Sequence, residues 1–126
     1  MSSLGLDGVE VRYGKQVAVH SFTQHVGPGE WVCLIGPNGA GKSSVLRAVA
    51  GLARHNGAIT VDGSPLFDRS PRRRAALVAF VPQAPLIPDD MTGLEYVLLG
   101  RNPYISYFGT ETKHDRALAR DVLGRL

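Results

Sequence analysis

The fold of this 126-residue chain is decided by eight residues, Gly36-Pro37-Asn38-Gly39-Ala40-Gly41-Lys42-Ser43. They match the pattern G-x-x-x-x-G-K-[ST] at every fixed position, and this pattern is typical of loops that bind nucleotide phosphates through backbone N–H groups. Gly39 and Gly41 permit the backbone angles that point successive amides inward. We expect Lys42 to reach the β- and γ-phosphates and the Ser43 hydroxyl to ligate Mg²⁺, with the adjacent Ser44 as part of the same site.

The residues on either side of this loop fit the same interpretation. Residues 31–35, Trp-Val-Cys-Leu-Ile, form a short apolar run that predicts a buried parallel strand before the loop. Val45, Leu46 and Val49 share one face of the helix predicted after the loop, and Gly51 is a suitable end for it. The alternative is a glycine turn that binds nothing, but Lys and Ser at these positions serve no turn.

Other strands follow from the hydrophobic periodicity. The pattern predicts them at residues 9–13, 17–22, 58–61 and 77–81, with a hairpin signal at Asp62-Gly63. The single cysteine, Cys33, falls within the strand predicted at 31–35 and is therefore expected to be a small buried hydrophobe.

The net charge of +3 comes largely from arginine, with a dense cluster at Arg69 and residues 72–74. A surface that binds single-stranded nucleic acid would carry interleaved aromatic side chains, and this cluster has none. Ser70 and Pro71 are instead typical of the N-cap and first position of a helix, so the arginines are expected on a short solvated helix. We predict no nucleic-acid partner, although salt-sensitive binding would revive a basic interaction protein as an alternative.

Two further helices are predicted towards the C-terminus. Thr92 and Glu95 have capping-box spacing for a helix to about residue 99. Residues 113–126 predict an amphipathic helix, because Leu118, Val122 and Leu126 recur four residues apart. No apolar run approaches the roughly 18 residues of a membrane span, and the first residues lack the features of a signal peptide, so a cytoplasmic location is expected.

Three stretches together resemble the N-terminal half of an ABC transporter ATP-binding subunit, and the resemblance covers essentially the whole chain. Residues 29–52 are close to that family's Walker A wording, residues 11–14, Val-Arg-Tyr-Gly, match its A-loop, and residues 81–83, Val-Pro-Gln, match its Q-loop. The resemblance implies that Tyr13 stacks on adenine and that Gln83 reaches Mg²⁺ or water near the γ-phosphate. The alternatives are an aromatic residue at a strand end and an exposed loop glutamine.

The resemblance implies an α/β fold, a P-loop NTPase of the ABC type. It has a β-rich N-terminal part, a parallel-sheet core and the start of a helical subdomain, and it would be incomplete at the C-terminus. Residues 1–83 would form the core of this partial nucleotide-binding domain and residues 84–126 the start of the helical subdomain.

The implied function is to bind Mg·ATP and power solute import through a membrane permease. A second copy of the subunit would complete the ATPase, at the inner face of the cell membrane. Residues 70–74, Ser-Pro-Arg-Arg-Arg, and residues 98–104, Leu-Leu-Gly-Arg-Asn-Pro-Tyr, resemble importers of iron–siderophore, haem or vitamin B12, with other nutrients still open.

Several motifs of the family do not occur among these residues: the Walker B strand, the LSGGQ-type signature and the switch histidine. The paired carboxylates Asp89 and Asp90 follow Ile-Pro rather than an apolar strand, so we interpret them as helix-entry residues. The histidines have no metal-ligand spacing; they are His20, His25, His55 and His114.

These departures keep other functions open. One is a nucleotide-binding module that does not hydrolyse ATP, and another is a different phosphate-loop enzyme, such as a small-molecule kinase or a GTPase. A GTPase is disfavoured because the chain has no N-K-x-D run. Without the missing strands, the sheet beside the phosphate loop would have unpaired edges, so we expect a marginally stable polypeptide that is prone to aggregate.

Overall fold

The computed structural model describes residues 2–125, which form two compact units. The first unit ends at Phe80 and the second begins at Val81, three residues before the boundary that the sequence suggested. No helix among the described residues is long and apolar enough to cross a membrane.

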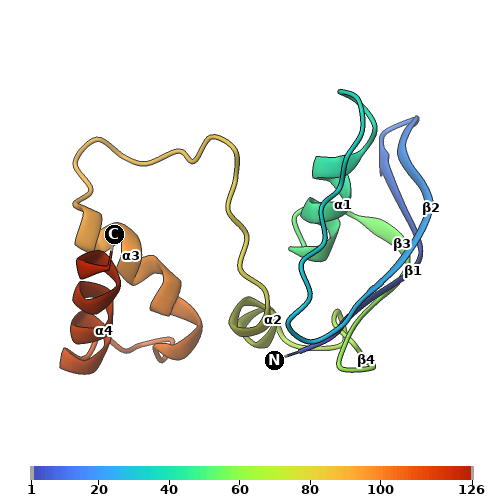
Figure 1. Ribbon diagram of the computed structural model, residues 1–126. Coiled ribbons are helices and arrows are strands. Elements are labelled where there is room, and N and C mark those ends of the chain that lie inside the picture. The colour runs from blue at the N-terminus through green and yellow to red at the C-terminus, as the bar shows by residue number, and fades with distance from the viewer. Residues whose placement is uncertain (1, 126) are drawn as a thin grey trace. The chain divides into compact units, whose positions relative to one another are not determined.

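The first unit is built on a four-stranded antiparallel sheet with the order β2-β1-β3-β4 (Figure 1). Its strands are β1 (Leu4–Tyr13), β2 (Gln16–Val26), β3 (His55–Val61) and β4 (Ser64–Pro65). β1 is the central strand, because it pairs with β2 on one side and with β3 on the other. The strands predicted at residues 9–13, 17–22 and 58–61 are therefore confirmed.

The turn between β3 and β4 is the predicted hairpin. Asp62 and Gly63 both have positive φ angles, 52° and 72°, as a two-residue type I′ turn requires. Asp62 also accepts a hydrogen bond from the backbone N–H of Ser3, 2.8 Å away. This bond ties the turn to the start of β1 and lowers the pKa of the Asp62 carboxyl.

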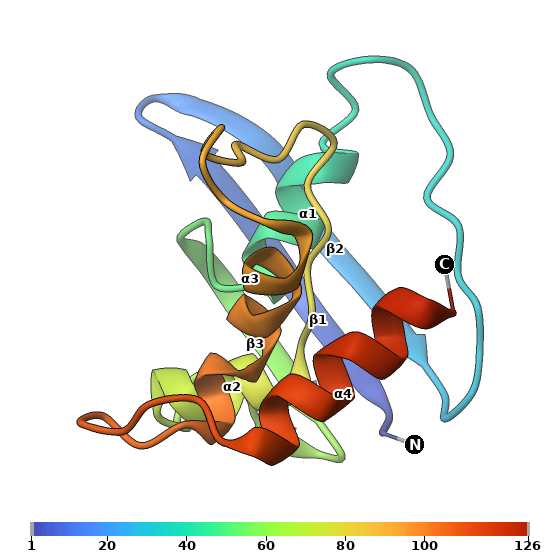
Figure 2. The same ribbon diagram turned by 90° about the vertical axis from the view of Figure 1, so that its left-hand side faces the viewer.

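Helix α1 (Lys42–Val49) packs on one face of this sheet (Figures 1 and 2). Val45 and Ala48 are buried there against the central strand and Leu66, whose side chain is fully buried. Val49 is partly buried, but the prediction for Leu46 was wrong, since it is 51% exposed. The side of α1 that faces the sheet therefore carries residues 45, 48 and 49.

The end of α1 confirms Gly51 as the stop. Gly51 has a φ of 74° and lies directly after the C-cap, Ala50. The N–H of Leu52 donates to the carbonyl of Arg47 at 2.8 Å, and the N–H of Gly51 donates to that of Ala48 at 3.0 Å. This pair of bonds is a Schellman motif, which satisfies the last carbonyls of the helix.

The strands predicted at residues 31–35 and 77–81 do not form. Residues 31–35 are an extended segment without the hydrogen bonds of a strand ladder (Figure 2). Of residues 77–81, Leu77 is the last residue of helix α2 (Pro71–Leu77), and the other four form no strand. A buried parallel strand needs a hydrogen-bonded neighbour, and none of the described strands runs beside either segment. Only Leu34 and Val78 pack, partly buried, against the core.

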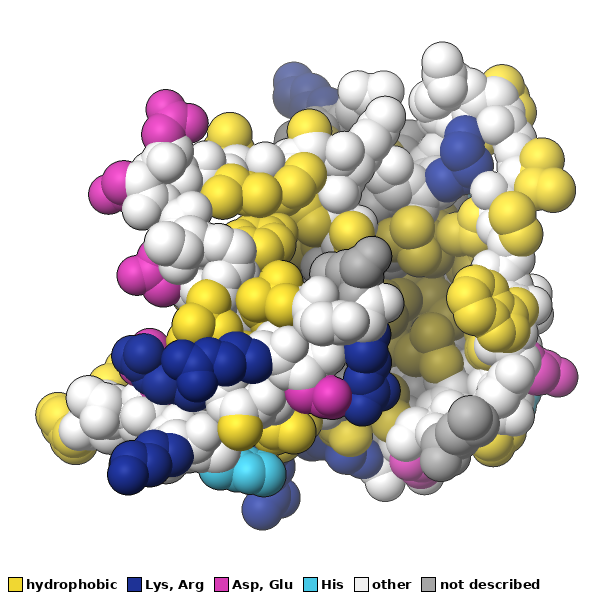
Figure 3. Space-filling model, turned by 60° about the vertical axis from the view of Figure 1, so that its left-hand side comes forward, with side chains coloured by type: hydrophobic (Ala, Val, Ile, Leu, Met, Phe, Trp, Pro, Cys, Tyr) yellow, Lys and Arg dark blue, Asp and Glu magenta, His cyan; other side chains and the backbone are white. Residues whose placement is uncertain are grey.

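The side chains of the first segment are exposed as a result. Trp31 is 100% exposed, Ile35 is 90% exposed, and Cys33 is an exposed free thiol rather than the buried residue expected. Figure 3 shows hydrophobic side chains at the surface of the face that it presents. Exposed apolar surface of this kind is typical of interaction sites and of aggregation-prone chains, and the expected marginal stability stays a prediction.

The second unit contains α3 (Gly93–Leu98), the 3₁₀ helix η1 (Leu99–Tyr104) and α4 (Lys113–Gly124), with α3 packed against α4. The predicted capping box is present, because Thr92 and Glu95 exchange hydrogen bonds at the start of α3. The start of α4 has a second capping box, formed by Thr112 and Asp115, which the sequence analysis missed although T-x-x-D was a readable signal.

The face of α4 that is buried differs from the prediction. Asp115 and Ala119 are buried, whereas Leu118 is 36% exposed and Val122 is 47% exposed; Leu126 lies outside the described residues. The reason is an ion pair, since Nε of Arg101 in η1 donates to Oδ1 of Asp115 at 2.8 Å. This bond turns the polar side of α4 towards its neighbour.

Replacing Asp115 by asparagine is expected to reduce the acid sensitivity of the second unit. The Thr112 hydroxyl and Arg101 hold the pKa of Asp115 well below its usual range. The carboxylate therefore stabilises the fold at pH values above its unfolded-state pKa, about 4, and this stabilisation is lost as the pH falls below that value. The measurement is the urea midpoint of the α4 amide NMR signals between about pH 2 and pH 6.

Asp121→Asn is the control, because Asp121 is an exposed acid on the same helix, paired with Arg125. An exposed pair contributes little, so this variant should keep the parent's pH dependence. Equal loss of pH dependence in both variants would contradict the role given to Asp115.

Candidate functional site

The stretch Gly36–Ser43 forms a loop that leads into the N-terminus of α1. Gly41 is the N-cap, and no side chain caps the helix. Within the loop the N–H of Ala40 donates to the carbonyl of Pro37 at 3.2 Å, which closes a turn. The first N–H groups of a helix have no partner inside it, so those of α1 are available to an anion, which the helix dipole also favours.

Two glycines shape this loop for different reasons. Gly39 and Gly41 have φ angles of 84° and 86°, in the left-handed region that favours glycine. A Cβ on Gly39 would meet nothing within 4 Å. A Cβ on Gly41 would collide with the backbone carbonyl oxygen of Ala18 and lie 2.9 Å from Cγ2 of Val19, so Gly41 also lets the loop approach β2 closely.

Lys42 folds back into the loop. Its Nζ donates to the carbonyl oxygens of Gly36 and Pro37, each at 2.7 Å. No carboxylate among the described residues forms an ion pair with this ammonium group. The loop therefore holds a positive charge that only backbone dipoles balance, and such a site is suited to a polyanion.

The hydroxyl of Ser43 is free for a ligand. Ser43 is exposed at the first turn of α1, and its side chain makes no hydrogen bond with the described part of the chain. A serine hydroxyl next to the phosphate-facing lysine is an oxygen ligand of the kind that Mg²⁺ accepts. The donor set therefore fits a magnesium nucleotide.

Tyr13 lies on the same unit as the loop. It ends β1, pairs with Gln16 of β2, and is 46% exposed. Ala18, which touches Gly41, is two residues further along β2, roughly 7 Å away at the rise of a strand. Tyr13 and Ala18 therefore belong to the same hairpin, whose strand β2 is contacted by the loop. No pattern in the sequence marks Ala18, because only tertiary packing brings its backbone carbonyl against Gly41.

Gln83 is exposed in an irregular segment at the start of the second unit. Its role remains a prediction from the sequence. No group of three or more His, Cys, Asp and Glu residues in the described part of the chain could hold a metal ion.

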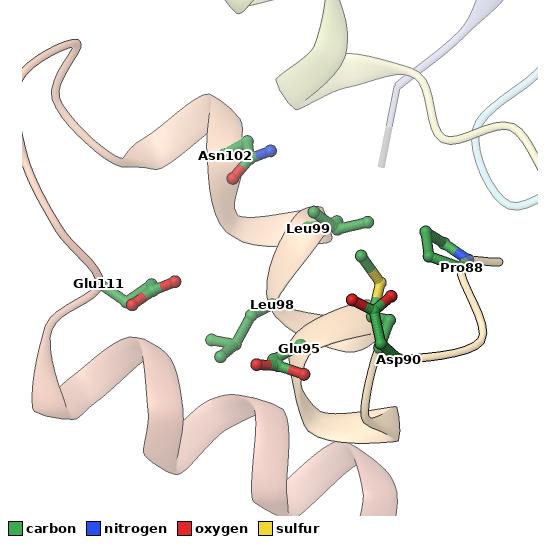
Figure 4. Close-up of a pocket in the computed structure, with 8 residues that line it drawn as sticks. Pro88, Asp90, Glu95, Leu98, Leu99, Asn102 and Glu111 are labelled. Carbon is green, nitrogen blue, oxygen red and sulfur yellow. The ribbon is translucent and has the colours of Figure 1, made fainter.

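A separate cavity of about 330 Å³ lies within the second unit (Figure 4). Leu98, Leu99 and Pro88 give it apolar walls, and Glu95 and Glu111 add carboxylates. Hydrogen bonds from Thr92 lower the pKa of Glu95 and so favour its charged form. Negative charge repels phosphates, which sets this cavity apart from the loop in the first unit.

Comparison with known proteins agrees with this geometry. The sequence profile described as ABC transporter matches residues 19–125. The chain is 39% identical to the hemin import ATP-binding protein HmuV of Myxococcus xanthus, over 82% of this chain and 39% of that protein. It is 34% identical to the iron(3+)-hydroxamate import ATP-binding protein FhuC of Bacillus subtilis, over 98% of this chain and 46% of that protein.

A solved structure shows the same fold. It is a metal-chelate type ABC transporter in an inward-facing conformation, which matches with a TM-score of 0.75 and 26% identity, over 98% of this chain and 44% of the other. The predicted fold class, a P-loop NTPase of the ABC type with a β-rich N-terminal part, is thereby confirmed. The chain spans less than half the length of the curated relatives it matches.

Proposed function

Since this chain belongs to the ABC transporter family, we propose that it forms the nucleotide-binding part of a transporter's ATPase subunit and binds Mg·ATP at the loop Gly36–Ser43. One observation carries the proposal. The Lys42 ammonium group lies inside a glycine loop, beside an uncapped helix N-terminus, and has no carboxylate partner among the described residues.

Each residue of the proposed site has a separate task. The backbone N–H groups of the loop and of the first turn of α1, including Ser44, bind phosphate oxygens. Lys42 exchanges its two carbonyl partners for the β- and γ-phosphates, and the Tyr13 ring stacks on adenine. Ser43 would ligate Mg²⁺, which would neutralise phosphate charge when bound, and the role of Gln83 towards this ion is proposed from the family resemblance alone.

The transport function is proposed from the relatives. Two of them are named as ATP-binding proteins for import of hemin and iron(3+)-hydroxamate, and another is named for manganese transport. We therefore propose that the whole protein powers uptake of a metal ion or metal chelate by hydrolysing ATP. It would work with a membrane permease and a second ATP-binding subunit at the cytoplasmic face of the membrane.

Replacing Tyr13 by alanine tests the adenine role. Stacking of a base on an aromatic ring contributes about 1–3 kcal/mol, so affinity for Mg·ATP should fall roughly 5- to 150-fold. Affinity for Mg·tripolyphosphate, which has no base, should stay the same. Isothermal titration of the chain with both ligands measures the two effects.

Tyr107→Ala is the matched control, because Tyr107 is 94% exposed and lies in the second unit. It should bind both ligands as the parent does. If Tyr13→Ala weakened tripolyphosphate and ATP alike, Tyr13 would support the loop rather than bind adenine.

A further inference from the structure

The first unit has a cavity of its own, at the opposite end of α1 from the phosphate loop. Its volume is about 630 Å³, and it opens beside the turn that follows α1, at residues 51–53. Its polar side chains are Arg54, His55, Asn56 and Arg74. The eight residues of α1 span roughly 12 Å, so this cavity is distinct from the proposed ATP site.

The wall of the cavity is organised around Phe67. The ring of His55 lies 4.5 Å from the Phe67 ring, centroid to centroid, and the Arg74 guanidinium lies 5.1 Å from the same ring. Arg74 is also fixed by a hydrogen bond from its Nη1 to the carbonyl of Arg69, at 3.0 Å. His55 and Arg74 are therefore held in place before any ligand binds. This reduces the side-chain entropy that would be lost on binding.

Arg54 supplies a charge that the fold does not use. It is exposed, and it makes no hydrogen bond or ion pair with the described residues. It lines both this cavity and a neighbouring one that contains Glu10. Glu10 is already engaged, because Arg12 donates to it at 2.7 and 3.2 Å and Asn56 donates at 3.3 Å.

No carboxylate lines the cavity itself. Arg54 and Arg74 both line this cavity, and guanidinium groups present planar sets of donors that match the oxygens of a phosphate group. His55 and Arg74 both lie against the Phe67 ring, so these two side chains belong to the same aromatic wall of the cavity. The matching ligand is an oxyanion with several acceptors.

We propose that this cavity is a second anion site, which binds a phosphate group through Arg54 and Arg74, with His55 as a further donor. The phosphate could be free inorganic phosphate or the phosphomonoester of a small metabolite, since both present the same oxygens. The volume exceeds what a free phosphate needs, and Leu52 and Ala53 border the remaining space. The site is independent of ATP binding at the loop.

The test is an amide NMR titration of the Lys42→Ala chain, so that binding at the phosphate loop does not interfere. Inorganic phosphate and glycerol 3-phosphate are added separately at constant ionic strength, with chloride as the salt. We expect shifts to concentrate at residues 51–56, Phe67 and Arg74. A lower dissociation constant for glycerol 3-phosphate would identify a phosphomonoester as the ligand, and a lower constant for inorganic phosphate would identify free phosphate.

Three arginine variants locate the site. Arg54→Ala should weaken binding about tenfold, the effect of losing one charge-assisted hydrogen bond, and the fold should survive because Arg54 has no partner to lose. Arg74→Ala should weaken it at least as much. Arg73→Ala is the control, since Arg73 lies on the same helix, is exposed and does not line the cavity.

Two results would overturn the proposal. One is equal weakening by Arg54→Ala and Arg73→Ala, because the anion would then respond to overall charge rather than to a site. The other is the absence of shifts around residues 51–56 with either ligand at concentrations that saturate ordinary phosphate sites. Neither result would affect the proposed ATP site, which is tested separately with Mg·ATP.

Discussion

Replacing Lys42 by alanine should abolish the stabilisation of this chain by Mg·ATP. The substitution removes the one charge that lies inside the loop, where it is held by the carbonyls of Gly36 and Pro37. A ligand at 100 times its dissociation constant stabilises a protein by about 2.7 kcal/mol. We expect this increment to fall below about 0.5 kcal/mol in the variant, which corresponds to a loss of roughly 100-fold in affinity. The measurement is the melting temperature with and without Mg·ATP.

Lys113→Ala is the matched control, because Lys113 is an exposed lysine in the second unit. It should leave the ATP-dependent shift in melting temperature unchanged. Lys42→Ala should melt close to the parent in the absence of ligand, since the side chain is bonded only to backbone carbonyls of the loop. If Lys42→Ala retained the full shift with ATP, the nucleotide would bind elsewhere.

Replacing Gly41 by alanine should damage both the fold and the site. A left-handed backbone costs a residue with a side chain about 1–2 kcal/mol, and Gly41 has a φ of 86°. The new methyl group would also overlap the carbonyl of Ala18, and overpacking of this kind adds about 1–3 kcal/mol. We expect a loss on the order of 2–5 kcal/mol in the free energy of unfolding, measured with urea, together with weaker ATP binding.

Gly39→Ala separates the two contributions. Gly39 has nearly the same φ, 84°, but an added methyl group would meet nothing within 4 Å. In this variant the free energy of unfolding should therefore fall only by the cost of the left-handed backbone, about 1–2 kcal/mol. Equal losses in both variants would mean that the loop does not press against β2 as described.

The features that the sequence predicted correctly depend on neighbours along the chain. Ser70 caps α2, Thr92 caps α3, and Gly51 ends α1, because each of these signals acts within one turn of its own helix. The turn at Asp62-Gly63 is local in the same sense. The loop itself could be recognised because its glycine and lysine positions are determined by the chemistry of phosphates.

The features that were predicted wrongly depend on distant partners. Residues 31–35 have the composition of a buried strand, but a strand forms only beside another, and composition cannot show whether one is present. Leu118 and Val122 remain partly exposed because the pair Arg101–Asp115 determines which side of α4 is covered. A buried ion pair between two helices leaves no periodic signal in the sequence.

The central place of β1 has a consequence for synthesis on the ribosome. β1 is made before the other strands of this sheet, and it can pair at once with β2, its neighbour in the chain. Its other partner, β3, is complete only when Val61 has been added, 48 residues after Tyr13. At about 5–20 residues per second, one edge of β1 waits roughly 2–10 s without a hydrogen-bonding partner. During that interval the nascent hairpin offers an open strand edge, so chaperone binding at this stage should depend on the speed of translation through residues 14–61.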